Sequence, residues 1–94
     1  MKEKLLKIIN HYGILKQLKY FQSEVFELNE AIINAENEYS MLKNIGNIAE
    51  EIADVMVMLE QFKLYYEISS EEITKIFWSK VDRQLGRIEN ENNK

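Results

Sequence analysis

Apolar residues recur at steps of three and four along most of the chain, and this spacing predicts helices. The first long stripe consists of Ile14, Leu18, Phe21, Val25, Leu28 and Ile32. The second consists of Ile48, Ile52, Val55, Leu59 and Phe62. The two stripes predict long helices over about residues 14–37 and 47–66.

Two further helices are predicted on either side of these. Residues 2–11 form a short amphipathic segment that ends before Gly13, and glycine is a common helix stop. Ser69 followed by Glu72 is typical of a helix N-terminus, because the serine side chain can accept a hydrogen bond from the backbone N–H three residues later. The last helix, to about Ile88, carries the stripe Ile73, Phe77, Val81 and Leu85.

We therefore expect a single all-α domain over residues 1–94, with residues 1–12 as a short leading helix. The mixed stretch 37–46 is the expected loop, and residues 89–94 are expected to fray. The helix over 47–66 is apolar nearly all round, which is typical of a buried helix. We expect an antiparallel helical bundle that is completed by oligomerisation, because another subunit would bury this helix. The apolar residues on its other side are Ala49, Ala53, Met56, Val57 and Leu64.

The composition excludes several kinds of chemistry. Of the 94 residues, 46% are hydrophobic and 30% charged, as in a soluble globular protein. The absence of cysteine and the single histidine exclude disulfides, thiolate or His-rich metal sites and a cysteine nucleophile. No apolar run approaches the roughly 18 residues that span a bilayer, and no signal-peptide segment is visible. We expect a cytoplasmic protein with no membrane partner.

Charge is unevenly distributed along the chain. Residues 1–20 carry five lysines against one glutamate, a local charge of +4. Residues 21–60 carry nine acids against Lys43, a local charge of −8. Such an acidic middle repels phosphate, so nucleic acid is not an expected partner. A divalent cation is the obvious species to neutralise it.

Four of these acids form two pairs with helical spacing. Glu24 and Glu27 lie beside the first long stripe, and Glu51 and Asp54 lie beside the second. If the two helices pack antiparallel through their stripes, the pairs converge at the edge of the seam. Four crowded carboxylates repel one another unless some are protonated or cations lie among them. Mg²⁺ prefers such oxygen-only ligands.

On the residues alone, two interpretations of these acids stay open. Acids three residues apart are common on solvated helix faces. Solvated faces, however, usually alternate opposite charges at helical spacing. Glu24 and Asp54 have no basic residue three or four positions away, which favours a metal site.

The last predicted helix carries a basic stripe. Lys80, Arg83 and Arg87 recur at steps of three and four. Taken alone, these residues are explained by pairing with nearby acids such as Asp82 or by solubility. Beside an acidic metal cluster, they would suit a polyphosphate, because an arginine guanidinium can donate two parallel hydrogen bonds to phosphate oxygens.

The acidic motifs resemble those of a known family. The run Glu24 to Leu28, EVFEL, is followed after a spacer by Glu50 to Val55, EEIADV. Together they resemble the ExxE…EExxD signature of the MazG-like, all-α nucleoside triphosphate pyrophosphohydrolases. The resemblance covers about residues 14–87. It is greatest to the short MazG-like proteins of Gram-positive bacteria and their phages.

The resemblance implies a helical bundle that assembles as a homodimer or homotetramer. It implies hydrolysis of nucleoside triphosphates, (d)NTPs, to the monophosphate and pyrophosphate with Mg²⁺, for which Mn²⁺ is a substitute. The metal ligands implied by the motif are Glu24, Glu27, Glu51 and Asp54. Glu50 and Glu51 are the candidate catalytic acids, with Glu50 as a group that orients water. The implied phosphate-binding residues are Lys80, Arg83 and Arg87.

Two other functions remain as alternatives to the enzyme. The first is a non-catalytic helical module whose apolar helix over 47–66 binds another chain. The second is a Mg²⁺- or Ca²⁺-binding regulator, against which the lack of an EF-hand type loop counts. In the enzyme the nucleophile is expected to be water, because no Ser–His or Cys–His arrangement is available to build another.

Overall fold

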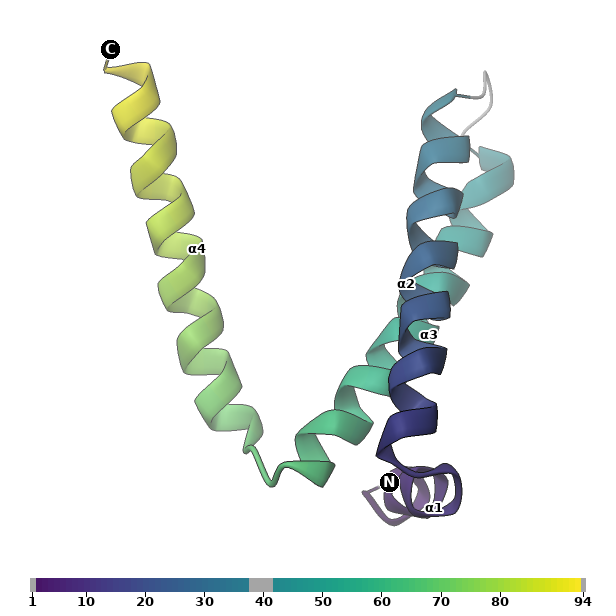
Figure 1. The fold of residues 1–94 in the computed structure, drawn as a ribbon. Helices are drawn as coiled ribbons and strands as arrows, with labels where there is room; N and C mark the ends of the chain where they lie inside the picture. Colours follow the sequence, from purple (N-terminus) through teal and green to yellow (C-terminus); the bar gives the residue numbers. More distant parts are fainter. Residues whose placement is uncertain (1, 38–41, 94) are drawn as a thin grey trace.

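The computed structural model describes residues 2–37 and 42–93, and these residues are helical apart from short connections (Figure 1). The elements are α1 (Lys2–Tyr12), α2 (Ile14–Asn37), α3 (Leu42–Tyr65) and α4 (Ser70–Asn92). This confirms the all-α prediction. The described residues include no helix that is long and apolar enough to cross a membrane.

The body of the molecule is an antiparallel hairpin of α2 and α3, with α1 packed across its base (Figure 1). Phe21 of α2 meets Phe62 of α3 edge to face, with ring centroids 5.3 Å apart. Ile9 of α1 is the most deeply buried apolar residue, with 2% of its surface exposed. Other buried apolar residues of the hairpin are Ala31, Ala35 and Met58.

The face of α2 that meets α3 is rotated from the predicted stripe, although Phe21 of that stripe still contacts α3. The buried residues of α2 are Gln17, Glu24, Ala31 and Ala35, at steps of seven and four. Leu18, Val25 and Ile32 lie on the neighbouring flank and are each 42% exposed. The small alanines let the two helix backbones approach closely, so the hairpin closes along this line.

Two predicted boundaries were also wrong. The helix expected from about residue 47 begins at Leu42, and the rest of the expected loop, residues 38–41, lies outside the described residues. A single glycine at position 46 costs only about 1 kcal/mol in a helix, too little to end it. The last helix, predicted to end at about Ile88, continues through Asn92, and the Asn93 N–H donates to the Glu89 carbonyl at 3.1 Å.

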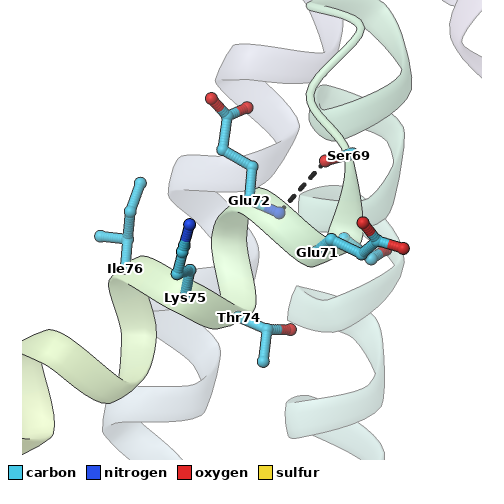
Figure 2. A pocket seen from close by; sticks show the side chains of 7 residues that line it. Ser69, Glu71, Glu72, Thr74, Lys75 and Ile76 are labelled. Carbon is cyan, nitrogen blue, oxygen red and sulfur yellow. Dashed lines mark hydrogen bonds between the residues drawn. The ribbon is translucent and has the colours of Figure 1, made fainter.

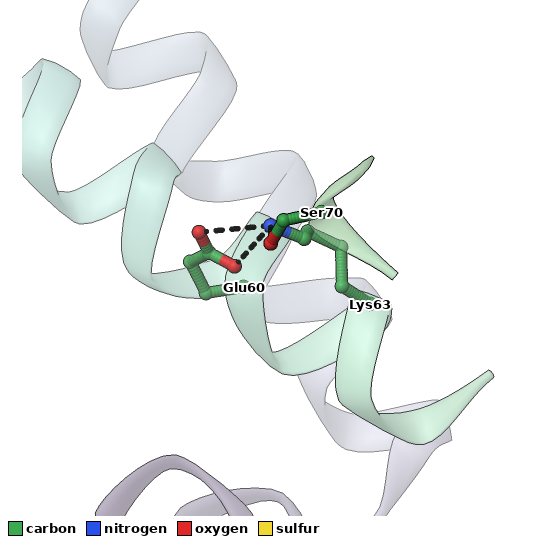
Figure 3. Close-up of polar contacts among 3 residues, drawn as sticks. All are labelled: Glu60, Lys63 and Ser70. Carbon is green, nitrogen blue, oxygen red and sulfur yellow. Dashed lines mark hydrogen bonds and ion pairs between the residues drawn. The ribbon is translucent and has the colours of Figure 1, made fainter. Parts of the chain in front are cut away.

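An elbow joins α3 to α4. Glu67 adopts a left-handed backbone conformation with φ of 56°. The Ser69 side chain accepts a hydrogen bond from the Glu72 N–H at 3.1 Å, which confirms the predicted start of α4 (Figure 2). Lys63 forms an ion pair with Glu60 at 2.8 Å and donates to the Ser70 hydroxyl at 2.9 Å (Figure 3). Of these, the bond between Lys63 and Ser70 joins the end of α3 to the first turn of α4.

Beyond the elbow, α4 leaves the body like one arm of a V (Figure 1). Among residues 2–37 and 42–93, the packing contacts between helices join α1, α2 and α3. No residue of α4 is buried. The structure therefore shows a three-helix body and one helix that has almost no packing partner in the chain.

Candidate metal centre

Glu24 is a charged residue in the middle of the α2–α3 seam. It is only 6% exposed, and its Oε2 atom has no hydrogen-bond partner among the described residues. It is buried because it shares a helix face with Gln17 and Ala31, each seven residues away. An ionised carboxylate in such a place is unfavourable unless a cation or a proton compensates its charge.

Glu51 and Asp54 face Glu24 from the opposite helix. One carboxylate oxygen from each of the three residues lies within 4.8 Å of the others. The Glu51 Oε2 atom is also buried and has no partner in the described part of the chain. The oxygens around a bound Mg²⁺ or Ca²⁺ lie roughly 3 to 5 Å apart. Small side-chain adjustments would therefore let all three residues bind one divalent ion.

The electrostatics of the cluster favour neutralisation. Burial, and then the charges of Glu27, Asp54 and Glu51, raise the pKa of Glu24, while a hydrogen bond with Tyr20 opposes this rise. Burial, and then the charges of Glu27 and Asp54, raise the pKa of Glu51. The nearby charge of Glu24 raises the pKa of the Tyr20 hydroxyl. Each of these shifts reflects negative charge that no cation of the described chain compensates.

The other two predicted acids lie at the margin of this cluster. Glu27 is exposed, yet its charge and a side-chain hydrogen bond act on Glu51. Glu50 is exposed on α3 and contributes a weaker charge effect to the same carboxyl. The structure therefore brings together Glu24, Glu51 and Asp54, with Glu27 beside them, and leaves Glu50 near the edge.

A cavity of about 380 Å³ opens beside the cluster. Glu24 and Asp54 form one side of it, and the residues that line the remainder include Tyr12, Lys16, Gln17, Tyr20 and Gln61. The two glutamines are buried and joined by a hydrogen bond of 2.8 Å, from the Gln17 Nε2 atom to the Gln61 Oε1 atom. The site thus combines carboxylates, aromatic rings, a fixed amide pair and one lysine.

Lys16 is a residue that the sequence analysis missed. Its ammonium lies 5.3 Å from the centre of the Tyr12 ring. It precedes Tyr20 by four residues and Glu24 by eight, so all three lie on one flank of α2. This spacing was visible in the sequence and could have identified Lys16 as a basic residue on the same flank of α2 as Glu24.

The basic stripe lies elsewhere in the chain. Lys80, Arg83 and Arg87 are exposed on α4, the arm that leaves the body. Lys80 and Arg83 line a shallow hollow formed by α4 alone. Within one chain the structure does not bring these cations to the acidic cluster, so their role in binding phosphate stays a prediction.

No family model, curated protein or solved structure matches the chain. The resemblance to the MazG-like family therefore stays a prediction, and any function must be argued from the site itself.

Proposed function

We propose that this protein is a Mg²⁺-dependent nucleoside triphosphate pyrophosphohydrolase of the MazG-like type. One observation carries the proposal: carboxylate oxygens from Glu24, Glu51 and Asp54 converge, and two of these side chains have a buried oxygen without a hydrogen-bond partner among residues 2–37 and 42–93. A set of oxygen-only ligands, partly buried beside an open cavity, suits a hard divalent cation that also binds phosphates.

In this proposal Glu24, Glu51 and Asp54 hold the cation, and Glu27 is near enough to join them. A bound Mg²⁺ would supply charge neutralisation for the phosphates and a lower pKa for a coordinated water. Glu50, which lies outside the converging group, is free to orient the attacking water or accept its proton. Attack at the α-phosphorus then yields the monophosphate, with pyrophosphate as the leaving group.

The cavity beside the acids suits the rest of the nucleotide. Its aromatic rings, Tyr12 and Tyr20, offer flat apolar surfaces for a base. The Gln17 amide offers hydrogen bonds that are held in one orientation by Gln61. Lys16 provides a positive charge for phosphate oxygens. Contacts from Lys80, Arg83 or Arg87 would require α4 of another copy or a different angle at the elbow.

The proposal includes assembly and location. We expect a homodimer or homotetramer, because α3 exposes an apolar face that one chain does not cover. A cytoplasmic location follows from the substrate, since nucleoside triphosphates are intracellular metabolites. Mn²⁺ is expected to replace Mg²⁺, because it accepts the same oxygen ligands.

The test is a panel of (d)NTPs incubated with the protein in the presence and absence of Mg²⁺. We expect metal-dependent formation of monophosphate and pyrophosphate in equal amounts, with no release of orthophosphate. Mixtures treated with EDTA serve as the control. Failure of the folded, metal-loaded protein to cleave any member of the panel would contradict the proposal.

A second candidate is a non-catalytic interaction module. The exposed apolar flank of the hairpin favours it, since Ile52, Met56 and Leu59 are between 43% and 56% exposed. Substitution of Asp54 distinguishes the two candidate functions. The enzyme loses activity, whereas the module keeps its binding, because Asp54 lies on the opposite flank of α3 from these residues.

A further inference from the structure

The molecule exposes far more surface than a compact chain of its mass. Its accessible surface is 8056 Å², whereas a folded monomer of 11.2 kDa exposes about 5,700 Å². Its radius of gyration is 17.0 Å, against about 12 Å for a compact domain of this length. The excess of about 2,400 Å² exceeds the roughly 800 Å² that each partner buries in a standard interface.

Part of this surface is an apolar flank of the hairpin. On α3 the exposed residues Ile45, Ala49, Ile52, Met56 and Leu59 recur at steps of four and three, as in a helix–helix seam. On α2 the exposed residues Leu18, Val25 and Ile32 lie on the same side of the hairpin. We call these eight residues the hairpin face. Of the acidic cluster, Glu24 lies buried in the seam between the helices, and Asp54 lies on the flank of α3 opposite the hairpin face.

The second unpartnered surface is the apolar stripe of α4. Phe77, Leu85 and Ile88 are each more than half exposed, and they share one side of the helix with Ile73 and Val81. Ile73 lines an apolar hollow of about 370 Å³ at the elbow together with Met56 and Leu59. The hairpin face and the α4 stripe therefore meet at the vertex of the V.

We infer that two copies of this chain form a dimer in which the α4 stripe of each copy packs against the hairpin face of the other. A second copy is the partner that fits, because one chain carries both complementary surfaces. A two-fold arrangement covers all four surfaces at once and closes without further growth.

The elbow favours pairing between copies over closure within one chain. Lys63 forms an ion pair with Glu60 and donates a hydrogen bond to Ser70, and the Ser69 side chain caps the N-terminus of α4. Of these bonds, Lys63–Ser70 crosses the elbow, and folding α4 onto its own hairpin would break it and change the left-handed conformation of Glu67. A second copy can occupy the V without any change at the elbow.

The test measures mass by sedimentation equilibrium from 1 to 100 µM chain, without metal or nucleotide, so that it is independent of the proposed activity. We expect twice the chain mass for the wild type. The double substitution Phe77→Glu and Leu85→Glu should weaken association at least 100-fold and leave single chains with unchanged helix content. The control, Ser79→Glu with Gly86→Glu, adds the same charge to the opposite side of α4, where a side chain at Gly86 meets nothing within 4 Å.

A second measurement identifies the surfaces. Equal amounts of ¹⁵N-labelled and unlabelled chain are unfolded, refolded together so that mixed dimers can form, cross-linked through Lys75 and Lys80, and analysed by mass spectrometry. Links from α4 to the hairpin that join labelled to unlabelled peptides support the inference. Links only within one isotope would show that α4 folds onto its own chain and would overturn it. A wild type that is a single chain at 100 µM, or a stripe variant as dimeric as the control, would also overturn it.

Discussion

The α2–α3 seam buries charged side chains, whereas the α4 helix exposes apolar ones. In the seam, the carboxylates of Glu24 and Glu51 are placed where apolar side chains usually lie, and each has a buried oxygen without a partner. On α4, large apolar side chains such as Phe77 and Leu85 are exposed. Buried charge and exposed apolar surface are both unfavourable in an isolated chain.

We infer from this contrast that the chain binds two kinds of partner. The seam requires positive charge, which a divalent cation supplies. The arm requires apolar surface, which a second copy supplies. The two requirements are separate, because the acids lie in and beside the seam, whereas the hairpin face lies on the other side of the hairpin from Asp54. Substitutions can therefore test each without disturbing the other.

The largest expected effect follows from removing one metal ligand. Asp54→Asn should lower the rate of (d)NTP hydrolysis by about 100-fold or more, because the remaining acids hold the cation less tightly and out of position. The rate of pyrophosphate release measures this. Glu30→Gln, which removes an exposed acid from α2 outside the cluster, is the matched control and should retain activity. Equal rates for the two variants would contradict the metal site.

A second prediction compares paired and unpaired polar groups within the seam. Gln61→Met keeps the volume but leaves the Gln17 amide N–H without its acceptor, which should cost about 2 kcal/mol in unfolding free energy. The double variant Gln17→Met with Gln61→Met should return close to wild-type stability, because neither amide then remains unpaired. Urea denaturation of the three proteins measures the effect. A double variant less stable than Gln61→Met would show that the amide pair is not the cause.

The third prediction concerns the unpaired carboxylate itself. Glu24→Gln should stabilise the metal-free protein by about 1 kcal/mol, because it removes a buried charge. The same substitution should remove the increase in melting temperature that Mg²⁺ gives the wild type. Thermal denaturation with and without Mg²⁺ measures both. A destabilised metal-free variant would mean that the Glu24 charge has a compensating partner in the native protein.

The smallest effect is a dependence of stability on pH. Burial raises the pKa of Glu24 and Glu51 above the ordinary 4.5, so the folded chain binds these protons more tightly than the unfolded chain. The contribution of these two groups to the stability of the metal-free protein should therefore be fully present below pH 4.5 and should be lost as the pH rises through the raised values. Denaturation between pH 4.5 and 7 measures this slope, which should be shallower in Glu24→Gln. A slope identical in the two proteins would contradict it.

Much of the fold could be predicted from the sequence. The bounds of α2 and the Ser69 cap followed from local spacing and capping chemistry. The face of α2 that packs could not be found in this way. Its apolar stripe and the line of Gln17, Glu24 and Ala31 are both regular, and only the packing of α3 against the small alanines decides between them.

The candidate site was predicted in part for the same reason. The spacing of Glu24, Glu51 and Asp54 predicted that acids converge across the hairpin, and the structure brings these three together. The burial of Glu24 was not expected, because it depends on which line of α2 faces the seam. The separation of the basic stripe from the acids depends on the angle at the elbow, which no local pattern determines.

The most direct test of the central claim is a titration with Mn²⁺ followed by electron paramagnetic resonance, since the signal of free Mn²⁺ falls when the ion is bound. We expect the wild type and Glu30→Gln to bind Mn²⁺ at millimolar concentration or below, and Mg²⁺ to displace it. Asp54→Asn and Glu24→Gln should leave the ion free. A wild type that binds no Mn²⁺, or all four proteins binding it equally, would contradict the claim that these buried carboxylates form a cation site.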